Sequence, residues 1–223
     1  MSRAKNNICT QDVHSHSILL DSREIFLHSQ EGNTDNDPGV DYKMSNCFLK
    51  NIRVLESIDS KKPIIIHQHS IGGYWTEAMM IYDIIDSSKC PIAIVTHGVA
   101  ASMGSIIPQA ADLVITMPNC WWLIHDGTTG INENFTIKMA KSWFSWEDRT
   151  SKQMLDIYTS SLKHSSKFKG KSESYIKSYI KRQLEKKEDW WLSGQEAVEY
   201  RFADAVFGSE GFESIEKINT YVH

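Results

Sequence analysis

The sequence predicts an α/β domain built on a largely parallel sheet, and three observations lead to this prediction. Short apolar runs alternate with amphipathic segments that have helical spacing. The connections between these segments are short, and glycine or proline marks most of them. The chain has 223 residues, of which 41% are hydrophobic, so it is long enough for one domain with a sizeable core.

The predicted elements follow one another from residue 22 onward. The alternation of short strands and helices with short connections is typical of a layered sheet whose strands are mainly parallel. In order, we expect a short strand within 22–30, a turn or loop at 31–41, a helix at 44–58, a strand at 62–69, a helix at 76–85, a strand at 91–98, a helix at 102–111, and strands at 112–118 and 120–126.

The C-terminal third has a different composition. Residues 132–187 are charged, rich in lysine and helical in pattern. Within 161–187, nine Lys or Arg stand against two Glu, which gives a local charge of 9 − 2 = +7. This pattern is typical of a solvated basic helix, and a docking face for an acidic partner is the alternative. Farther on, Ser193 and Glu196 have the spacing of a capping box, so we expect a helix to begin there.

The bulk properties limit the class of protein. A net charge of −4 gives no indication of nucleic-acid binding. No apolar run reaches the roughly 18 residues that a membrane span needs. His67 and His69 share one face of a predicted strand, but no third ligand follows at a suitable spacing, so a zinc site is not expected. No CxxC pair occurs, and we expect inert thiols in a reducing, cytoplasmic compartment for the four cysteines, Cys9, Cys47, Cys90 and Cys120.

Ser102 and the glycines at 72–73 lie where α/β sheets build their sites, at the ends of predicted strands or in loops. Ser102 stands before a predicted helix, whose first N–H groups stabilise negative charge. An oxyanion beside Ser102 would face the N–H of Met103. Gly72 or Gly73 would supply a second donor, because glycine permits a close backbone approach. The alternative is a purely structural serine in a turn of small residues.

His125 is the candidate general base. It follows the apolar run WWLI and precedes DGTTG, which suits a base that must reach a serine. The alternative is a histidine that only hydrogen-bonds at the end of a strand. The tryptophan pairs at 121–122 and 190–191 are interpreted as core or interface packing. A carboxylate must fix the imidazole tautomer, and the pattern alone leaves four candidates open: Asp112, Asp126, Asp189 and Asp204.

Several motifs, in this order, resemble ClpP, the proteolytic subunit of the ATP-dependent Clp proteases. SIGG followed by IYDII resembles the Ser-Pro-Gly-Gly loop of the family and the helix after it, and GVAASMGS resembles the nucleophile segment. MPNCWWLIHDG resembles the segment that leads into the catalytic histidine, and DWWLSGQEAVEYRFADAV resembles the segment that begins with the triad aspartate. The similarity covers roughly 22–208. The chain departs from the family at Ile71, where Pro is usual, and at 126–127, where Gln-Pro is usual, which suggests a divergent, phage-like or plasmid-like member.

The resemblance implies a ClpP/crotonase-type α/β fold, with a ClpP-like peptidase domain at 22–208 that consists of a head and a protruding helical handle at about 132–187. Residues 1–21 would be a flexible segment and 209–223 a C-terminal tail. It also implies a serine endopeptidase with an oxyanion hole from Met103 and the Gly72–Gly73 loop, and with the triad Ser102, His125 and Asp189. Neither a metal nor an organic cofactor is expected.

The partners implied by the resemblance are further copies of the chain, in heptameric rings or stacked tetradecamers. An AAA+ unfoldase is a further possible partner, and the substrate would be a peptide or an unfolded protein, with no nucleic acid and no membrane. Three alternatives stay open: a crotonase-type acyl-CoA hydratase or isomerase, a catalytically inactive assembly subunit of the same fold, and a Ser-Lys peptidase.

Overall fold

The computed structural model describes residues 10–28, 39–127 and 136–222. Its strands are β1 (Ile18–Leu19), β2 (Glu24–Leu27), β3 (Ile64–Ser70), β4 (Ile92–Ala101), β5 (Leu113–Thr116), β6 (Trp121–Ile124), β7 (Trp190–Ser193) and β8 (Ala205–Val206). Its helices are α2 (Tyr42–Ile58), α3 (Trp75–Asp86), α4 (Met103–Ile106), α5 (Ile137–Leu162), α6 (Glu173–Lys187), α7 (Gly194–Glu199) and α8 (Ile215–Tyr221). Two 3-10 helices complete them, η1 (Ile107–Ala110) and η2 (Ser166–Phe168).

The strands form one sheet in the order β1-β2-β3-β4-β5-β8, from which β6 and β7 branch at β4. The ladder from β2 to β8 and the β4–β6 pair are parallel, whereas β1–β2 and β6–β7 are antiparallel. The predicted α/β class with a largely parallel sheet is therefore confirmed. The first half of β4 pairs with β5 and its last residues, 99–101, pair with β6, so that β4 reaches farther than its neighbour.

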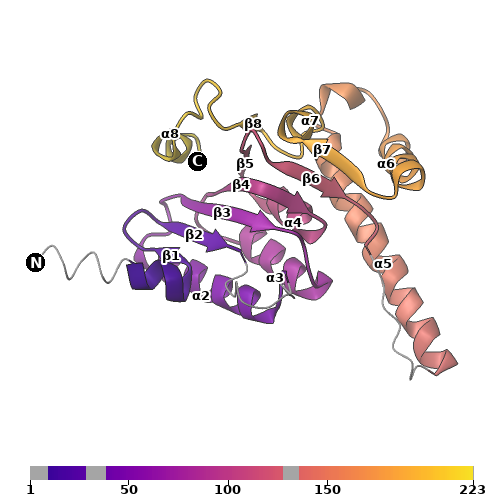
Figure 1. Ribbon diagram of the computed structural model, residues 1–223, viewed down its shortest axis with the longest axis horizontal. Coiled ribbons are helices and arrows are strands. Elements are labelled where there is room, and N and C mark those ends of the chain that lie inside the picture. Colours follow the sequence, from indigo (N-terminus) through magenta and orange to yellow (C-terminus); the bar gives the residue numbers. More distant parts are fainter. Residues whose placement is uncertain (1–9, 29–38, 128–135, 223) are drawn as a thin grey trace, which may run out of the picture.

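The sheet is covered on both faces, with α2 and α3 on one side and α8 on the other (Figure 1). Alternate residues of β3 and β4 point to opposite faces, as the two-residue period of a strand requires. The larger core contains Ile66 and Ile94 together with buried residues of α2, α3, α5 and α6. The smaller core packs Ile65 and Val95 against Ile218 of α8. Neither α8 nor the strands β1, β7 and β8 had been predicted, because each is short or begins in a polar segment.

Caps and breakers set several element ends. The carboxylate of Asp41 accepts the N–H groups of Lys43 and Met44, which explains why α2 begins two residues before the predicted 44–58. The predicted capping box of Ser193 and Glu196 is confirmed at the start of α7. The predicted helix at 102–111 is instead the four-residue α4 followed by η1. Pro108 lies in the first turn of η1, and having no N–H it cannot continue an α-helical ladder.

Arg23 ties β2 to the end of α2. Its side chain is buried, and its guanidinium donates hydrogen bonds to the carbonyls of Leu55, Asp59, Lys62 and Pro63 at 2.9–3.2 Å. Arg23 therefore supplies a donor to carbonyls in the segment that follows α2, and it gives the Leu55 carbonyl a second donor beside the N–H of Asp59. The described cysteines, Cys47, Cys90 and Cys120, are free thiols, and Cys9 lies outside the described residues.

Helices α5 and α6 occupy most of the range 132–187, of which 132–135 lie outside the described residues. The C-terminal half of α5 packs into the main core, and the other half extends away from the sheet (Figure 1). Of the segment 1–21, expected to be flexible, residues 10–16 are helical and β1 follows, while 1–9 lie outside the described residues. None of the described helices is long and apolar enough to cross a bilayer.

The two tryptophan pairs divide between core and surface. Trp122 and Trp190 are fully buried, whereas Trp121 and Trp191 are about half exposed.

Polar side chains meet across three neighbouring strands, where the imidazole of His67 in β3 lies 3.1 Å from that of His97 in β4 and 2.8 Å from the carboxylate of Glu24 in β2. Within 10–28, 39–127 and 136–222, no group of three or more His, Cys, Asp or Glu is arranged to hold a metal ion.

Candidate active site

The predicted triad residues lie at the ends of three neighbouring strands. Ser102 follows β4, His125 follows β6, and Asp189 precedes β7. The parallel pairing of Ala101 with Leu123 brings the ends of β4 and β6 together. Because β6 and β7 are antiparallel, with Ile124 opposite Trp190, the next residues along, His125 and Asp189, also face each other.

Ser102 has an unusual backbone conformation, with φ 54° and ψ −126°. A positive φ is uncommon for a residue with a side chain and is held only where the surroundings enforce it. Here the N–H of Ser102 donates to the carbonyl of Leu123 at 3.0 Å, which anchors the turn to β6. The side chain makes no capping hydrogen bond to α4, so the half-buried hydroxyl is not used to start that helix.

The Gly72–Gly73 loop lies directly against Ser102. A Cβ on Gly72 would lie 2.6 Å from the Cβ of Ser102 and 3.1 Å from the backbone nitrogen of Met103. Gly72 also has φ +98°, so a side chain at this position would be strained as well as overlapping. This contact puts the loop, Ser102 and the first N–H of α4 in one place.

The candidate oxyanion donors differ in whether their N–H groups already have a hydrogen-bond acceptor. Met103 is the first residue of α4, so its N–H has no intrahelical acceptor. The N–H of Gly72 donates to the Ser70 hydroxyl at 3.1 Å. Gly73 forms a parallel bridge with Val40. In this bridge the N–H of Val40 donates to the carbonyl of Gly72, and the carbonyl of Val40 accepts the N–H of Tyr74. The N–H of Gly73 therefore points away from the bridge. Gly73 and Met103 are therefore the better pair of donors.

His125 and Asp189 are close but not hydrogen-bonded. His125 Nδ1 lies 3.6 Å from Asp189 Oδ1, beyond the usual limit of about 3.2 Å for a nitrogen–oxygen hydrogen bond. The imidazole is 20% exposed and the carboxylate 51%, so water screens their attraction. Within the described part of the chain, the buried Nε2 of His125 has no hydrogen-bond partner.

The other candidate acids are used differently. Asp112 accepts the N–H of Ile92 at 2.8 Å, and Asp204 accepts the N–H of Val114 at 2.8 Å, so both fix the starts of strands. Asp126 is exposed in the segment after β6. Asp189 is the candidate that lies next to Nδ1 of His125.

A tight turn leads into Asp189. The N–H of Asp189 donates to the carbonyl of Lys187 at 2.6 Å, and the residue between them, Glu188, has φ 58° and ψ −64°. These values are those of a γ-turn of the rare, strained kind. The turn ends α6 and leads into β7, so that Asp189 lies immediately before the first residue of this strand.

Sequence reasoning missed a buried polar group behind Ser102. Ser105, the last serine of the SMGS motif, is fully buried and contacts the hydroxyl of Tyr158 in α5. The spacing of three residues could have indicated Ser105, because a serine hydroxyl reaches back to the carbonyl of residue i−3 in a helical turn. Tyr158 has no local signal, because it lies 53 residues away along the chain.

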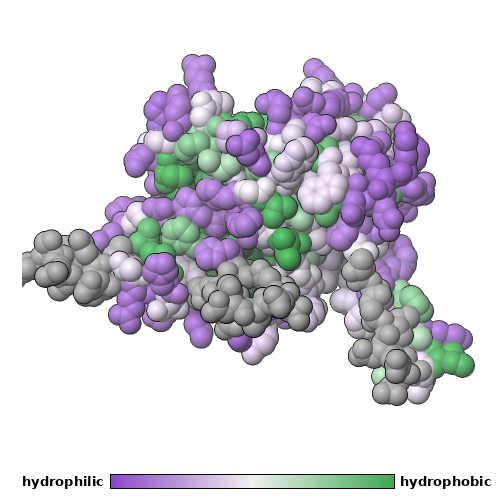
Figure 2. All heavy atoms as spheres, in the orientation of Figure 1, coloured by the Kyte–Doolittle hydropathy of each residue, from purple (hydrophilic) through white to green (hydrophobic). Residues whose placement is uncertain are grey.

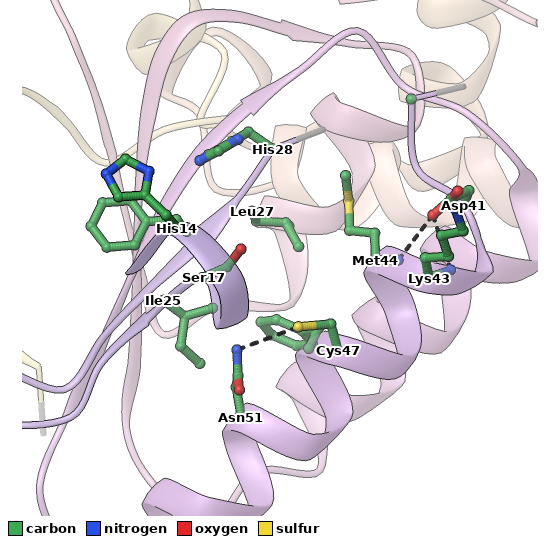
Figure 3. A pocket seen from close by; sticks show the side chains of 13 residues that line it. His14, Ser17, Ile25, Leu27, His28, Asp41, Lys43, Met44, Cys47 and Asn51 are labelled. Atoms are coloured by element: carbon green, nitrogen blue, oxygen red, sulfur yellow. Dashed lines mark hydrogen bonds between the residues drawn. The ribbon is translucent and has the colours of Figure 1, made fainter. Parts of the chain in front are cut away.

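A separate cavity of about 270 Å³ lies between β2 and α2 (Figure 3). Apolar side chains, including Ile25, Leu27 and Phe48, form part of its wall, with Cys47 and Asn51 beside them. None of the predicted triad or oxyanion residues lines it. The cavity is therefore distinct from the site at the strand ends.

An α/β sheet that presents a serine on a strained turn, near a histidine–carboxylate pair and two backbone amides, is the arrangement of a serine hydrolase. Comparison with known proteins narrows this class. The Clp protease family model matches residues 9–210. The ATP-dependent Clp protease proteolytic subunit 2 of Nocardia farcinica is 28% identical over 84% of this chain and 82% of its own length. The proteolytic subunit 1 of Salinibacter ruber is 26% identical over 91% of this chain and 78% of its own length.

The same fold occurs in a solved structure. A ClpP1 mutant from Listeria monocytogenes superimposes with a TM-score of 0.66 at 21% identity, covering 84% of this chain and 92% of that one. Since the family model spans most of the sequence, the chain belongs to the Clp protease family. It is a serine endopeptidase of the ClpP-like type, and the family assignment favours this class over an acyl-CoA enzyme on a related fold.

Proposed function

We propose that this chain hydrolyses peptide bonds through an acyl-enzyme formed on Ser102. His125 acts as the general base, Asp189 orients it, and the N–H groups of Gly73 and Met103 bind the oxyanion. With Nδ1 protonated and directed at Asp189, Nε2 of His125 is the unprotonated nitrogen. This nitrogen has no hydrogen-bond partner among the described residues, Ser102 included, so it is free to accept the proton of Ser102 once the two side chains approach.

The reaction proceeds in two halves. The Ser102 oxygen attacks the peptide carbonyl while its proton passes to Nε2 of His125, and the resulting oxyanion is held by the two amides. His125 returns the proton to the leaving amine. A water molecule then attacks the ester, with His125 again serving as base, and releases the new carboxylate. The distance of 3.6 Å between His125 and Asp189 must shorten by about 0.5 Å for a hydrogen bond, and such contacts commonly tighten when substrate binds.

The observation that best supports the proposal is the contact of Gly72 with Ser102 and Met103. It brings the loop that carries the Gly73 amide against the serine and against the free N–H of α4. The register of β4, β6 and β7 explains why His125 and Asp189 lie at the same edge. Catalytic side chains from neighbouring strand ends are the usual construction in α/β enzymes.

The direct test is labelling with a fluorophosphonate, followed by hydrolysis of a fluorogenic peptide. We expect the probe to modify Ser102, and Ser102→Ala to lower kcat by about 10³-fold or more. Ser105→Ala cannot serve as a control here because Ser105 contacts the Ser102 backbone, so an exposed serine such as Ser172, the N-cap of α6, is the matched choice. Peptide cleavage by Ser102→Ala at the rate of Ser172→Ala would disprove the assignment.

The role of Asp189 is tested by comparing two isosteric changes. Asp189→Asn should retain the fold and lower kcat by about 10⁴-fold, because the amide favours the wrong imidazole tautomer. Asp126→Asn, which alters the carboxylate next to His125 in sequence, should retain most of the activity. If the two results were reversed, the orienting acid would be Asp126.

Assembly and partners follow from the family and belong to the same proposal. Family membership implies ring oligomers and association with Clp ATPases, and we propose heptameric rings, singly or stacked, that cooperate with an AAA+ unfoldase on unfolded proteins. Hydrophobic side chains gather at the free end of α5 (Figure 2), where Ile137 is 79% exposed and Met139 and Phe144 are more than half exposed. Clustered exposed apolar residues favour contact with other protein surfaces. Sedimentation analysis tests the ring, and fractionation tests the expected cytoplasmic location.

A further inference from the structure

A buried hydroxyl pair lies directly behind the proposed nucleophile. Ser105 Oγ lies 2.7 Å from the carbonyl oxygen of Ser102 and 3.1 Å from that of Leu123. It is also 2.7 Å from the hydroxyl oxygen of Tyr158. Ser105 and Tyr158 are both fully buried. The pair therefore connects helix α5 to the turn of Ser102 and to the strand that leads to His125.

The count of protons decides how this pair is arranged. Ser105 has one hydroxyl proton, and two carbonyl oxygens lie within reach of it. These carbonyls can only accept, so the Ser105 proton is directed to them, most closely to Ser102. We assign Tyr158 as the donor to Ser105 Oγ, because in this arrangement both hydroxyl protons have an acceptor. Burial raises the pKa of the Tyr158 phenol well above its usual value, and the charge of Asp126 adds to this, so the phenol keeps its proton at neutral pH.

The hydrogen bonds of Ser105 and Leu123 hold the backbone of Ser102. Its N–H is fixed to Leu123, and its carbonyl accepts from both the N–H and the hydroxyl of Ser105. Both peptide groups that flank the Ser102 side chain are thus held, and they maintain the strained φ of 54°. We propose that Tyr158 and Ser105 are positioning residues for the nucleophile: a hydrogen-bond chain from α5 that holds the Ser102 turn in its reactive conformation. This inference depends on the proposed function of Ser102.

The expected kinetic effect is on the chemical step. Neither residue is exposed, so neither contacts the substrate, and KM should stay within about twofold of its original value. Tyr158→Phe keeps the ring, including its edge-to-face contact with Phe202 at 5.5 Å, and removes only the hydroxyl. Loss of one buried hydrogen bond that positions a nucleophile should lower kcat by about tenfold. Ser105→Ala should have a similar effect, and the double variant should be no slower than the slower single variant, because both changes break the same chain.

The experiment compares this pair with a second, half-buried hydroxyl pair in the same protein. The hydroxyls of Tyr179 and Tyr200 are hydrogen-bonded at 2.8 Å, and neither tyrosine takes part in the hydrogen bonds of the Ser102 turn. Tyr179→Phe is therefore a matched control for the loss of stability. For each full-length variant we would measure kcat, KM, the rate of fluorophosphonate labelling at Ser102 and the thermal midpoint.

The outcomes are distinguishable. The proposal expects Tyr158→Phe to reduce kcat and the labelling rate together by about tenfold, and Tyr179→Phe to change only the thermal midpoint. If both variants lose stability while kcat and labelling stay at their original values, the pair is only structural and the inference is overturned. If the original protein is not labelled at Ser102 at all, the proposed function itself fails, which is a separate result.

Discussion

Replacing Gly72 with alanine should disable the site without unfolding the protein. The added Cβ would lie 2.6 Å from the Cβ of Ser102, whereas carbon atoms normally approach no closer than about 3.5 Å. The loop and the serine must therefore separate by about 1 Å. A misplacement of this size in a catalytic constellation costs about 10²-fold in rate, so we expect kcat/KM of Gly72→Ala to fall by about that factor.

The positive φ of Gly72 has a separate cost, which a second variant isolates. Gly208 has φ +94°, close to the +98° of Gly72, but a Cβ there would meet nothing within 4 Å. Gly208→Ala should thus lose about 1–2 kcal/mol of stability to backbone strain and keep its activity. Peptide hydrolysis and urea unfolding would be measured on both variants. Activity of Gly72→Ala equal to that of Gly208→Ala would refute the inferred contact between the loop and the nucleophile.

Two further predictions concern stability. Arg23→Met keeps an apolar stem but removes the guanidinium that donates to the carbonyls of Lys62 and Pro63, so the free energy of unfolding should fall by about 2 kcal/mol; an unchanged urea midpoint would contradict this. Burial, reinforced by His67 and His69, lowers the pKa of His97, so the unfolded chain binds this proton more tightly than the folded chain. Stability should therefore decline as the pH falls below about 6.5, and His97→Gln should show a shallower decline in urea titrations at successive pH values; identical slopes would rule out this role for His97.

The elements of the sheet's centre could be predicted because their signals are local. Strands β3 and β4 are apolar runs, and the cap of α7 lies within four residues. Strand β7 was missed because its residues, WWLS, are half buried and follow a charged helix, so that only pairing with β6 makes them a strand. The early end of α4 likewise depends on Pro108 and on packing that no periodicity shows.

Only some residues of the candidate site could be predicted from the sequence. The residue pattern alone left four acids open, and the motif resemblance selected Asp189. The pairing of β6 with β7 is what puts Asp189 beside His125. The choice of Gly73 over Gly72 as donor depends on a hydroxyl from Ser70 and a bridge to Val40. Tyr158 could not have been found, because a contact across 53 residues leaves no mark in the neighbouring sequence.

The antiparallel pairing of β6 with β7 fixes the position of Asp189, the proposed triad acid. Because Ile124 pairs with Trp190, this register keeps Asp189 beside His125 independently of the length of the chain between residues 126 and 188. Residues can therefore be gained or lost in the half of α5 that extends from the sheet, and in the loop between α5 and α6, without shifting the carboxylate. A family built this way is free to lengthen the intervening helices and adapt them to new neighbours while its chemistry stays in register.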